Sequence, residues 1–296
     1  MKKPLDAPPL EKVRALVKRY LERFETIGWN RFTSFKWSAI ESESLTEAQL
    51  DALKTAMLVE DHIPDYSRSY QEMLAIQDGL PPGELAFRRE MLHFVFRWVG
   101  DEDRHAHTLE NYLRACGRVD ADALSLEMLA TLSKPYTRPH PGPMQMAVHT
   151  VIQEKATQVF YACLRDAVEE PVLKEILALL SQDEARHCGF FVDLLKLYLE
   201  TPGGADYREI KEAVVEFKMP LHGIIDNYKR RSIAMMRAAP GYNYREAFSL
   251  IQLALGRYAD ARVESRSHTL EDLLATLTAI DKGGRPPARI YGTMAG

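Results

Sequence analysis

Cysteine is rare in this chain and occurs only as Cys116, Cys163 and Cys188. Three is an odd number and no two of them form a CxxC pair, which argues against a disulfide framework and against a cysteine-based zinc motif. Cysteines used in this way fit a reducing compartment. We therefore expect the three side chains to be small residues of the core.

Long hydrophobic runs are also absent. The residues LDAPPLEKVR that follow Met1, Lys2 and Lys3 contain no hydrophobic segment of the kind that a secretory signal needs. No apolar run is long enough to cross a bilayer. A formal net charge of -4 gives no support to a nucleic-acid-binding role. These absences predict a cytoplasmic protein with no membrane span and no nucleic-acid partner.

The chain shows no sustained alternation of apolar and polar residues that would predict β-strands, and no linker within its core. Its 296 residues are 46% hydrophobic and 27% charged, which is typical of a globular protein with a substantial core. Helical periodicity predicts an all-α single domain over residues 1–296, with a core bundle at about 45–200 and C-terminal helices at about 206–280. The predicted helices lie near residues 11–27, 45–78, 84–116, 121–132, 144–169, 171–200, 206–216, 220–236 and 243–260.

Several helix boundaries carry local signals. Ser44 with Glu47 three positions on predicts a capping box at the start of helix 45–78. Pro64 predicts a kink inside that helix, because proline leaves the carbonyl four residues earlier without its donor. Gly117 is a suitable C′ residue for the next long helix.

A motif that could carry chemistry occurs twice. Asp-Glu-x-Arg-His stands at 101–105 and again at 183–187. Each copy places a Glu and a His three positions apart, which on a helix puts them one turn apart on the same face. Carboxylate and imidazole together suit a transition metal such as iron. The alternative is a charged, solvated helix surface, and a single such pair would favour it.

The residues around both copies favour a buried site. Apolar positions recur at spacings of three and four on either side of each motif; they are Met91, Phe94, Trp98, Leu109 and Tyr112 around the first, and Leu177, Leu180, Phe191, Leu194 and Tyr198 around the second. The Glu and His of each motif therefore belong to the apolar seam of a long helix. Buried acids need partners or a metal.

Two more acids, Glu60 and Glu154, occupy apolar seams of their own helices. Four long helices would then carry, in chain order, Glu60; Glu102 and His105; Glu154; Glu184 and His187. One Glu from each of two helices and a Glu-x-x-His from each of the others is the pattern of ferritin-like bundles that bind two irons or two manganese ions. Four carboxylates balance two divalent cations, which explains how so much acid can be buried.

At these motifs the chain resembles a family, the ferritin-like acyl-[acyl-carrier-protein] desaturases. The resemblance covers nearly the whole chain and is carried by VEDHIPDY at 59–66, DEDRH at 101–105, QEKAT at 153–157, DEARH at 183–187, KMPLHG at 218–223 and YREAFSLIQLALGRY at 244–258. It implies a ferritin-like four-helix bundle with a di-iron centre, elaborated by additional N- and C-terminal helices.

The resemblance also implies roles for single residues. It makes Glu102 and Glu184 bridging ligands, Glu60 and Glu154 terminal carboxylates, and His105 and His187 terminal imidazoles. Thr157 matches a family threonine beside the oxygen-binding site, and Asp183 matches an acid on the electron path. The tryptophan of that path is either Trp37 or Trp29.

The implied activity is O2-dependent desaturation of a fatty acyl chain held on an acyl carrier protein. It would need two Fe ions, O2 as co-substrate and electrons from ferredoxin or a similar reductase, and the family implies a homodimer. The family's E-E-N-R-H is D-E-D-R-H here, which keeps both ligands, and the gap between Glu60 and Glu102 differs slightly. Double-bond position, chain length, carrier protein against CoA, and Fe2 against Mn/Fe stay open. Two alternative functions remain: a di-iron oxygenase, and a non-catalytic metal-binding protein.

Overall fold

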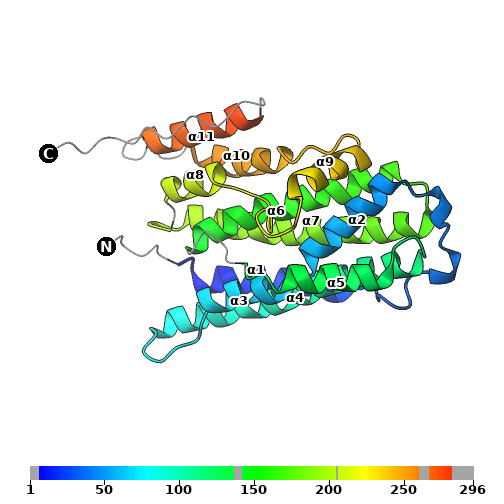
Figure 1. Ribbon diagram of the computed structural model, residues 1–296. Helices are drawn as coiled ribbons and strands as arrows, with labels where there is room; N and C mark the ends of the chain where they lie inside the picture. The colour runs from blue at the N-terminus through cyan, green and yellow to red at the C-terminus, as the bar shows by residue number, and fades with distance from the viewer. Residues whose placement is uncertain (1–6, 137–141, 205, 260–266, 282–296) are drawn as a thin grey trace.

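The computed structural model describes residues 7–136, 142–204, 206–259 and 267–281 (Figure 1). Within these ranges the chain is helical and contains no β-strand, as predicted. The helices are α1 (Leu10–Thr26), α2 (Glu47–Glu60), α3 (Ile63–Met73), α4 (Pro82–Ala115), α5 (Ala121–Leu132), α6 (Pro143–Ala167), α7 (Pro171–Glu200), α8 (Tyr207–Val215), α9 (Tyr228–Ala238), α10 (Glu246–Ala259) and α11 (Ser267–Asp281), with short 3-10 turns at Trp37–Ala39 and Ser42–Ser44.

Four helices form the central bundle. α6 and α7 pack along their length, α4 packs on α2 and also contacts α7, and α1 fills the groove between α4 and α7. The helices α8, α10 and α11 lie together over α6, on the upper side of the view in Figure 1, and α9 covers α2. The buried apolar side chains form one continuous core from Val13 to Ile280. This is the predicted bundle with added N- and C-terminal helices.

Prolines and a buried acid set the starts of the long helices. Pro82, Pro143 and Pro171 each begin a helix, where the missing N–H costs no hydrogen bond. Glu170, which is fully buried, caps α7 by accepting from the backbone N–H of Leu173 at 2.7 Å. The same carboxylate accepts from the hydroxyl of Tyr112 on α4 at 2.8 Å, so the cap also fixes α7 against α4.

The single helix predicted at 45–78 is wrong, because the chain breaks between α2 and α3. Pro64 occupies the first turn of α3, and α2 ends four residues before it, at Glu60. The proline ring would clash with the Glu60 carbonyl in a continuous helix. The predicted Ser44 cap is also wrong. Thr46 and Gln49 form the capping box instead, with Gln49 N–H donating to Thr46 Oγ1 at 3.2 Å and Thr46 N–H donating to Gln49 Oε1 at 2.8 Å.

The C-terminal helices differ most from the prediction. The helix expected at 220–236 begins only at Tyr228, because Leu221 and Asn227 have φ values of 59° and 57°, which interrupt a right-handed helix. α11 was not predicted as a separate helix. The predicted end of α4 is confirmed, since Gly117 has φ 69°. Among the described residues no helix is long and apolar enough to span a membrane.

Candidate metal centre

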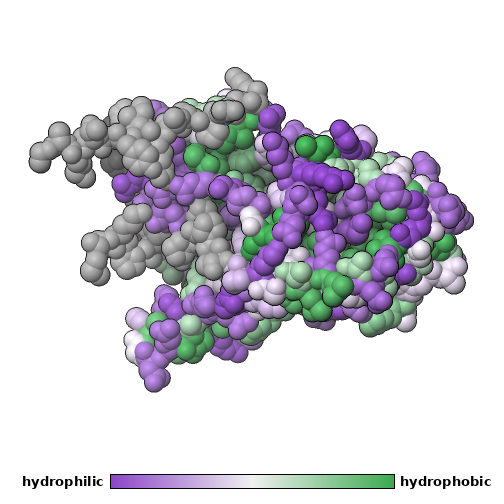
Figure 2. Space-filling model, in the orientation of Figure 1, coloured by the Kyte–Doolittle hydropathy of each residue, from purple (hydrophilic) through white to green (hydrophobic). Residues whose placement is uncertain are grey.

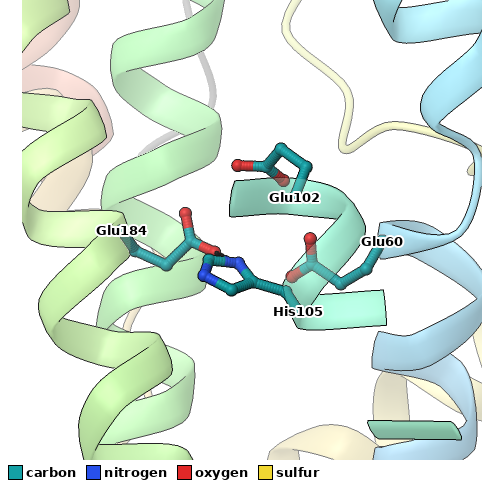
Figure 3. A group of neighbouring side chains, drawn as sticks. All are labelled: Glu60, Glu102, His105 and Glu184. Atoms are coloured by element: carbon teal, nitrogen blue, oxygen red, sulfur yellow. Dashed lines mark ion pairs between the residues drawn. The ribbon is translucent and has the colours of Figure 1, made fainter. Parts of the chain in front are cut away.

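The six residues predicted as ligands converge in the middle of the bundle. Glu60 is the last residue of α2, Glu102 and His105 lie on α4, Glu154 lies on α6, and Glu184 and His187 lie on α7. Each of the six side chains is at most 4% exposed. Figure 3 shows four of them, Glu60, Glu102, His105 and Glu184, pointing toward a common centre from three helices.

The six side chains form two overlapping clusters. The first holds Glu60, Glu102, His105 and Glu184, and the second holds Glu102, Glu154, Glu184 and His187. Within each cluster, one potential ligand atom per residue lies within 4.8 Å of all the others. Glu102 and Glu184 belong to both clusters. Two neighbouring metal positions with a pair of shared carboxylates therefore fit the geometry.

Burial of so many acids perturbs their protonation. Burial raises the pKa of Glu60 well above its ordinary value of 4.5, and repulsion from Glu102 adds to the shift. The pKa of Glu184 is raised well above the same value, by burial and then by Glu102 and Glu154. Burial is also the largest cause of the raised pKa of Glu102. Without cations, the centre therefore favours the protonated form of these acids.

The two histidines respond in opposite ways. Burial lowers the pKa of His105 to about 4, which keeps that ring neutral. Burial alone would lower the pKa of His187, but the hydrogen bonds that its protonated ring donates to surrounding carboxylates raise it well above its ordinary value. Nδ1 of His187 lies 3.0 Å from Oε1 of Glu102 and 3.3 Å from Oε2 of Glu154. A protonated His187 thus supplies part of the positive charge that the acids require.

A second layer supports the histidines through a crossed arrangement of the two motif copies. Nε2 of His105 lies 3.1 Å from Oδ2 of Asp183, and Nε2 of His187 lies 3.4 Å from Oδ2 of Asp101. Each histidine of one copy therefore contacts the aspartate of the other. A carboxylate at Nε2 holds the ring N–H there, so that Nδ1 of each histidine faces the cluster and can bind a cation when it carries no proton.

Arginines neutralise these two aspartates. Nη2 of Arg104 lies 2.7 Å from Asp101 and 2.8 Å from Asp183, so one guanidinium bridges both. Arg97 contacts Asp101 at 2.9 Å, and Arg186 contacts Asp183. Burial alone would raise the pKa of Asp101, but His187 and Arg104 lower it to about 2. Sequence reasoning missed Asp101, although its place in the repeat, equivalent to Asp183, was a usable signal.

The polar atoms of the centre fit the metal pair that the sequence implies. Oε1 of Glu184 and Nδ1 of His105 are buried and lie 3.1 Å apart, but neither forms a properly oriented hydrogen bond within the described part of the chain. Such atoms are costly to bury unless a partner binds them. Carboxylate and imidazole donors together suit divalent transition metals. The donor set and the unsatisfied atoms therefore both agree with a two-metal site.

A tyrosine that sequence reasoning left without a role contacts the centre. The hydroxyl of Tyr161 on α6 donates to Oε1 of Glu60 at 2.5 Å, and its side chain is fully buried. The hydrogen bond occupies one oxygen of Glu60 and leaves the other, Oε2, available as a ligand. Tyr161 lies two turns after Glu154 on the same face of α6, which is the only sequence signal of its position.

The two candidate tryptophans have different neighbours. Nε1 of Trp29 donates to Oδ2 of Asp183 at 2.9 Å, and its ring is parallel to that of His105, with centroids 6.4 Å apart. Trp37 lies farther out, and its Nε1 donates to the carbonyl of Phe32. Trp29 is therefore the tryptophan beside Asp183, which favours Trp29 over Trp37 for the predicted path.

Thr157 lies three positions after Glu154 on α6 and is half-buried. No hydrogen bond from its hydroxyl to other described residues is recorded, in contrast to Thr108, whose hydroxyl donates to the Arg104 carbonyl at 2.7 Å. The hydroxyl is thus not committed to the usual backbone bond of a helical threonine.

Comparison with known proteins identifies the family. The profile of the fatty acid desaturase family matches residues 32–257. The chain belongs to this family. Stearoyl-[acyl-carrier-protein] 9-desaturase 6, chloroplastic, from Arabidopsis thaliana is 28% identical over 190 residues, which are 62% of this chain and 47% of that protein. The putative acyl-[acyl-carrier-protein] desaturase DesA1 of Mycobacterium tuberculosis is 23% identical over 239 residues, which are 73% of this chain and 67% of that protein.

The fold agrees with this assignment. The crystal structure of the putative acyl-ACP desaturase DesA2 from M. tuberculosis matches with a TM-score of 0.60 at 17% sequence identity, covering 90% of this chain and 98% of that one. The match confirms the predicted ferritin-like fold, and the family confirms the resemblance seen in the sequence. The matched region spans about half of the Arabidopsis protein, so the activity of the whole relative is not transferred with the fold.

Proposed function

We propose that the protein is an acyl-[acyl-carrier-protein] desaturase that uses two irons, O2 and external electrons to introduce a double bond into a carrier-bound fatty acyl chain. The observation that carries the proposal is the sharing of Glu102 and Glu184 between two four-residue clusters. Family membership and the named activities of the relatives support the reaction type.

The proposed ligands follow from the two clusters. One iron would be held by Glu60 and His105 and the other by Glu154 and His187, with Glu102 and Glu184 available to both. When bound, the iron pair supplies the oxidising power, with O2, that removal of hydrogen from an unactivated methylene needs and no side chain offers.

The chain's own residues orient these ligands and protect the site. Asp101 and Asp183 hold the two imidazoles through Nε2, and Tyr161 holds Glu60 through one oxygen. The burial of all these groups keeps bulk water away from the carboxylates. Thr157 is proposed to act beside the oxygen site through its hydroxyl, which is not engaged in a helical backbone hydrogen bond.

Electrons are proposed to enter through the Trp29 and Asp183 pair. Trp29 is partly exposed, and it connects through Asp183 to His105, a proposed ligand. Arg104 lies over the Trp29 ring at 4.4 Å and also contacts Asp183, so the three groups are packed together. The proposed donor is a ferredoxin or a similar reductase.

The acyl carrier protein is the proposed partner of a basic surface on α9. Lys229, Arg230 and Arg237 are exposed, and Figure 2 shows strongly hydrophilic surface over this helix. Carrier proteins are acidic, so charge complementarity favours docking here. Arg231 does not belong to this surface, because it pairs with Glu127 of α5.

Two further parts of the proposal concern assembly and location. A homodimer is supported by exposed apolar side chains on α5, where Leu126 is 69% and Leu129 is 64% exposed (Figure 2). We also propose that the protein acts in the cytoplasm, in agreement with its three free cysteines.

The proposal is tested by mass spectrometry of carrier-bound saturated acyl chains after incubation with iron-loaded protein, reductant and O2. A product two hydrogens lighter is expected, without 18O when the reaction is run under labelled O2. Incorporation of one 18O atom would instead identify an oxygenase. No change in any acyl chain would contradict the desaturase function.

A further inference from the structure

A tyrosine crosses the bundle interior about one helical turn from the carboxylate centre. Tyr70 of α3 is 1% exposed, and its hydroxyl oxygen lies 2.5 Å from Oγ1 of Thr150 on α6. Thr150 precedes Glu154 by four positions, or about 6 Å along the helix. The Tyr70 ring lies 5.0 Å from Trp98 on α4 and 6.0 Å from Phe191 on α7, centroid to centroid. The Tyr70 side chain therefore contacts α4, α6 and α7 at this level of the bundle.

A small apolar cavity lies on the far side of Tyr70 from the centre. Its lining includes Tyr70, Met73, Met91, Met146, Phe191 and Leu194. Each of α4, α6 and α7 contributes one residue that Tyr70 contacts. On each of these helices, other residues that line the cavity lie farther along the helix from the proposed ligands than that contact does. Met91, for example, lies 11 positions before Glu102, about 16 Å along α4. The cavity volume is about 20 Å³, room for about one water molecule. An acyl tail does not fit there as the side chains stand.

We propose that Tyr70 determines substrate specificity by limiting the length of acyl chain on the methyl side of the reacting carbons. The inference rests on the proposed desaturase function. A saturated chain that runs past the carboxylate centre along the bundle meets the Tyr70 ring within about one turn.

The ring is held in place by polar and apolar contacts together. Moving it breaks the buried hydrogen bond to Thr150, which costs free energy because water does not replace that bond in the interior. It also separates the ring from Trp98, which contacts His187 at 6.4 Å between centroids. The methionines beyond it are flexible and would adapt to a tail, so the rigid ring and not the cavity wall sets the limit.

The test compares variants that differ in ring volume and in hydrogen bonding. Tyr70→Leu shortens the side chain that stands between the cavity and the centre. Tyr70→Phe removes only the hydroxyl and serves as the matched control. Met146→Ala enlarges the cavity but leaves the ring in place. The substrates are saturated acyl chains on carrier protein that differ by two carbons.

We expect Tyr70→Leu to raise kcat/KM for the next longer chain, relative to the wild type's best substrate, by at least about tenfold, the usual effect of one or two methylenes in an apolar pocket. Tyr70→Phe alone and Met146→Ala alone should leave this ratio of kcat/KM values unchanged. The double variant Tyr70→Leu with Met146→Ala should raise it further. A correctly folded Tyr70→Leu variant with the wild-type ratio would overturn the inference. So would a Met146→Ala variant that accepts longer chains by itself, a result that stays decisive if Tyr70→Leu fails to fold.

A binding measurement separates this inference from the proposed function. Displacement of a fluorescent fatty acid by the saturated series gives the length dependence of affinity without turnover. If wild-type protein binds and desaturates no acyl chain, the proposed function fails. If it does both and the length limit is the same in Tyr70→Leu, only the role of Tyr70 is refuted.

Discussion

Asp183 and His105 belong to different copies of the repeated motif, and Oδ2 of Asp183 lies 3.1 Å from Nε2 of His105. Asp101 and His187 form the reverse pair at 3.4 Å. Each of the two helices that carry the motifs therefore supplies ligands itself and supports a ligand of the other. Neither copy can build its half of the centre without α4 packed against α7.

Asp101→Asn should weaken metal binding, because it removes the negative charge that stabilises the Nε2–H of His187. Loss of such a supporting carboxylate typically lowers metal affinity by about 10- to 100-fold. Competition with a chelator of known affinity measures the change. Asp103→Asn is the control, since Asp103 belongs to the same motif but is exposed and pairs with Arg31. Equal affinity of wild type and Asp101→Asn would contradict the supporting role.

Glu184→Ala should reduce metal content at both positions, because Glu184 belongs to both clusters, whereas His105→Ala affects one cluster. We expect about two metal equivalents per chain in the wild type, about one in His105→Ala, and less than one in Glu184→Ala. Elemental analysis of reconstituted protein gives these values. Glu175→Ala, an exposed position on the same helix, should match the wild type. A wild type with less than about one equivalent would refute the ligand assignment.

Thr157→Val keeps the volume of the side chain and removes its hydroxyl. If the hydroxyl acts beside the oxygen site, the variant should retain metal and fold normally while turnover falls, or while more electrons are consumed per product formed. Both are measured in one assay that follows NADPH consumption and product. Unchanged turnover and coupling would leave Thr157 with a packing role alone.

The metal-free chain should lose stability as pH rises. Glu60, Glu102 and Glu184 have folded-state pKa values above the ordinary 4.5, and His187 has one well above 6.5, so the folded state binds protons that the unfolded chain releases. The pKa of His105 is lowered to about 4, so below about pH 6.5 the unfolded chain binds a proton that the folded state does not. His105 therefore opposes the trend only below about pH 6.5.

We therefore expect chelation to lower the Tm more at about pH 8 than at about pH 6. Metal binding to the folded state adds stability at both pH values by mass action. The comparison uses identical buffers and apo protein shown to be monodisperse. Equal Tm values for verified holo and apo protein at both pH values would mean that the acids do not share one buried site.

Charge reversal on α9 should weaken docking of an acidic carrier. For the double variant Lys229→Glu with Arg230→Glu we expect a higher KM for acyl-carrier protein, with little change in kcat, and a difference from wild type that shrinks at high salt. The double variant Lys12→Glu with Lys18→Glu on α1, where both side chains are exposed, is the charge-matched control. A KM that does not change at low salt would place the docking surface elsewhere.

The helices and the ligand seams were predictable because their signals are local. Periodicity places Glu102 and His105 in an apolar seam, and proline or glycine marks the helix ends. A kink at Pro64 was predicted, but the complete break after Glu60 was not, since apolar positions continue through Tyr70 in the same register. Here the geometry of proline outweighs the pattern.

The contacts around the ligands were less predictable because they join distant parts of the chain. Tyr161 meets Glu60 across 101 positions, and Trp29 meets Asp183 across 154. No spacing rule relates such pairs. The choice between Trp29 and Trp37 depended on the path of the irregular segment after α1, where the sequence has no regular periodicity to read.

The end of α2 at Glu60 gives the centre one ligand unlike the others. Glu102, His105, Glu154, Glu184 and His187 sit well inside helices of 25 to 34 residues, whereas Glu60 is followed directly by the turn at Asp61. A helix terminus frays at a lower free energy than a helix interior. We therefore expect Glu60 to be the ligand that moves with the least disruption of the helices, and the α2–α3 junction to be the first part of the centre to open.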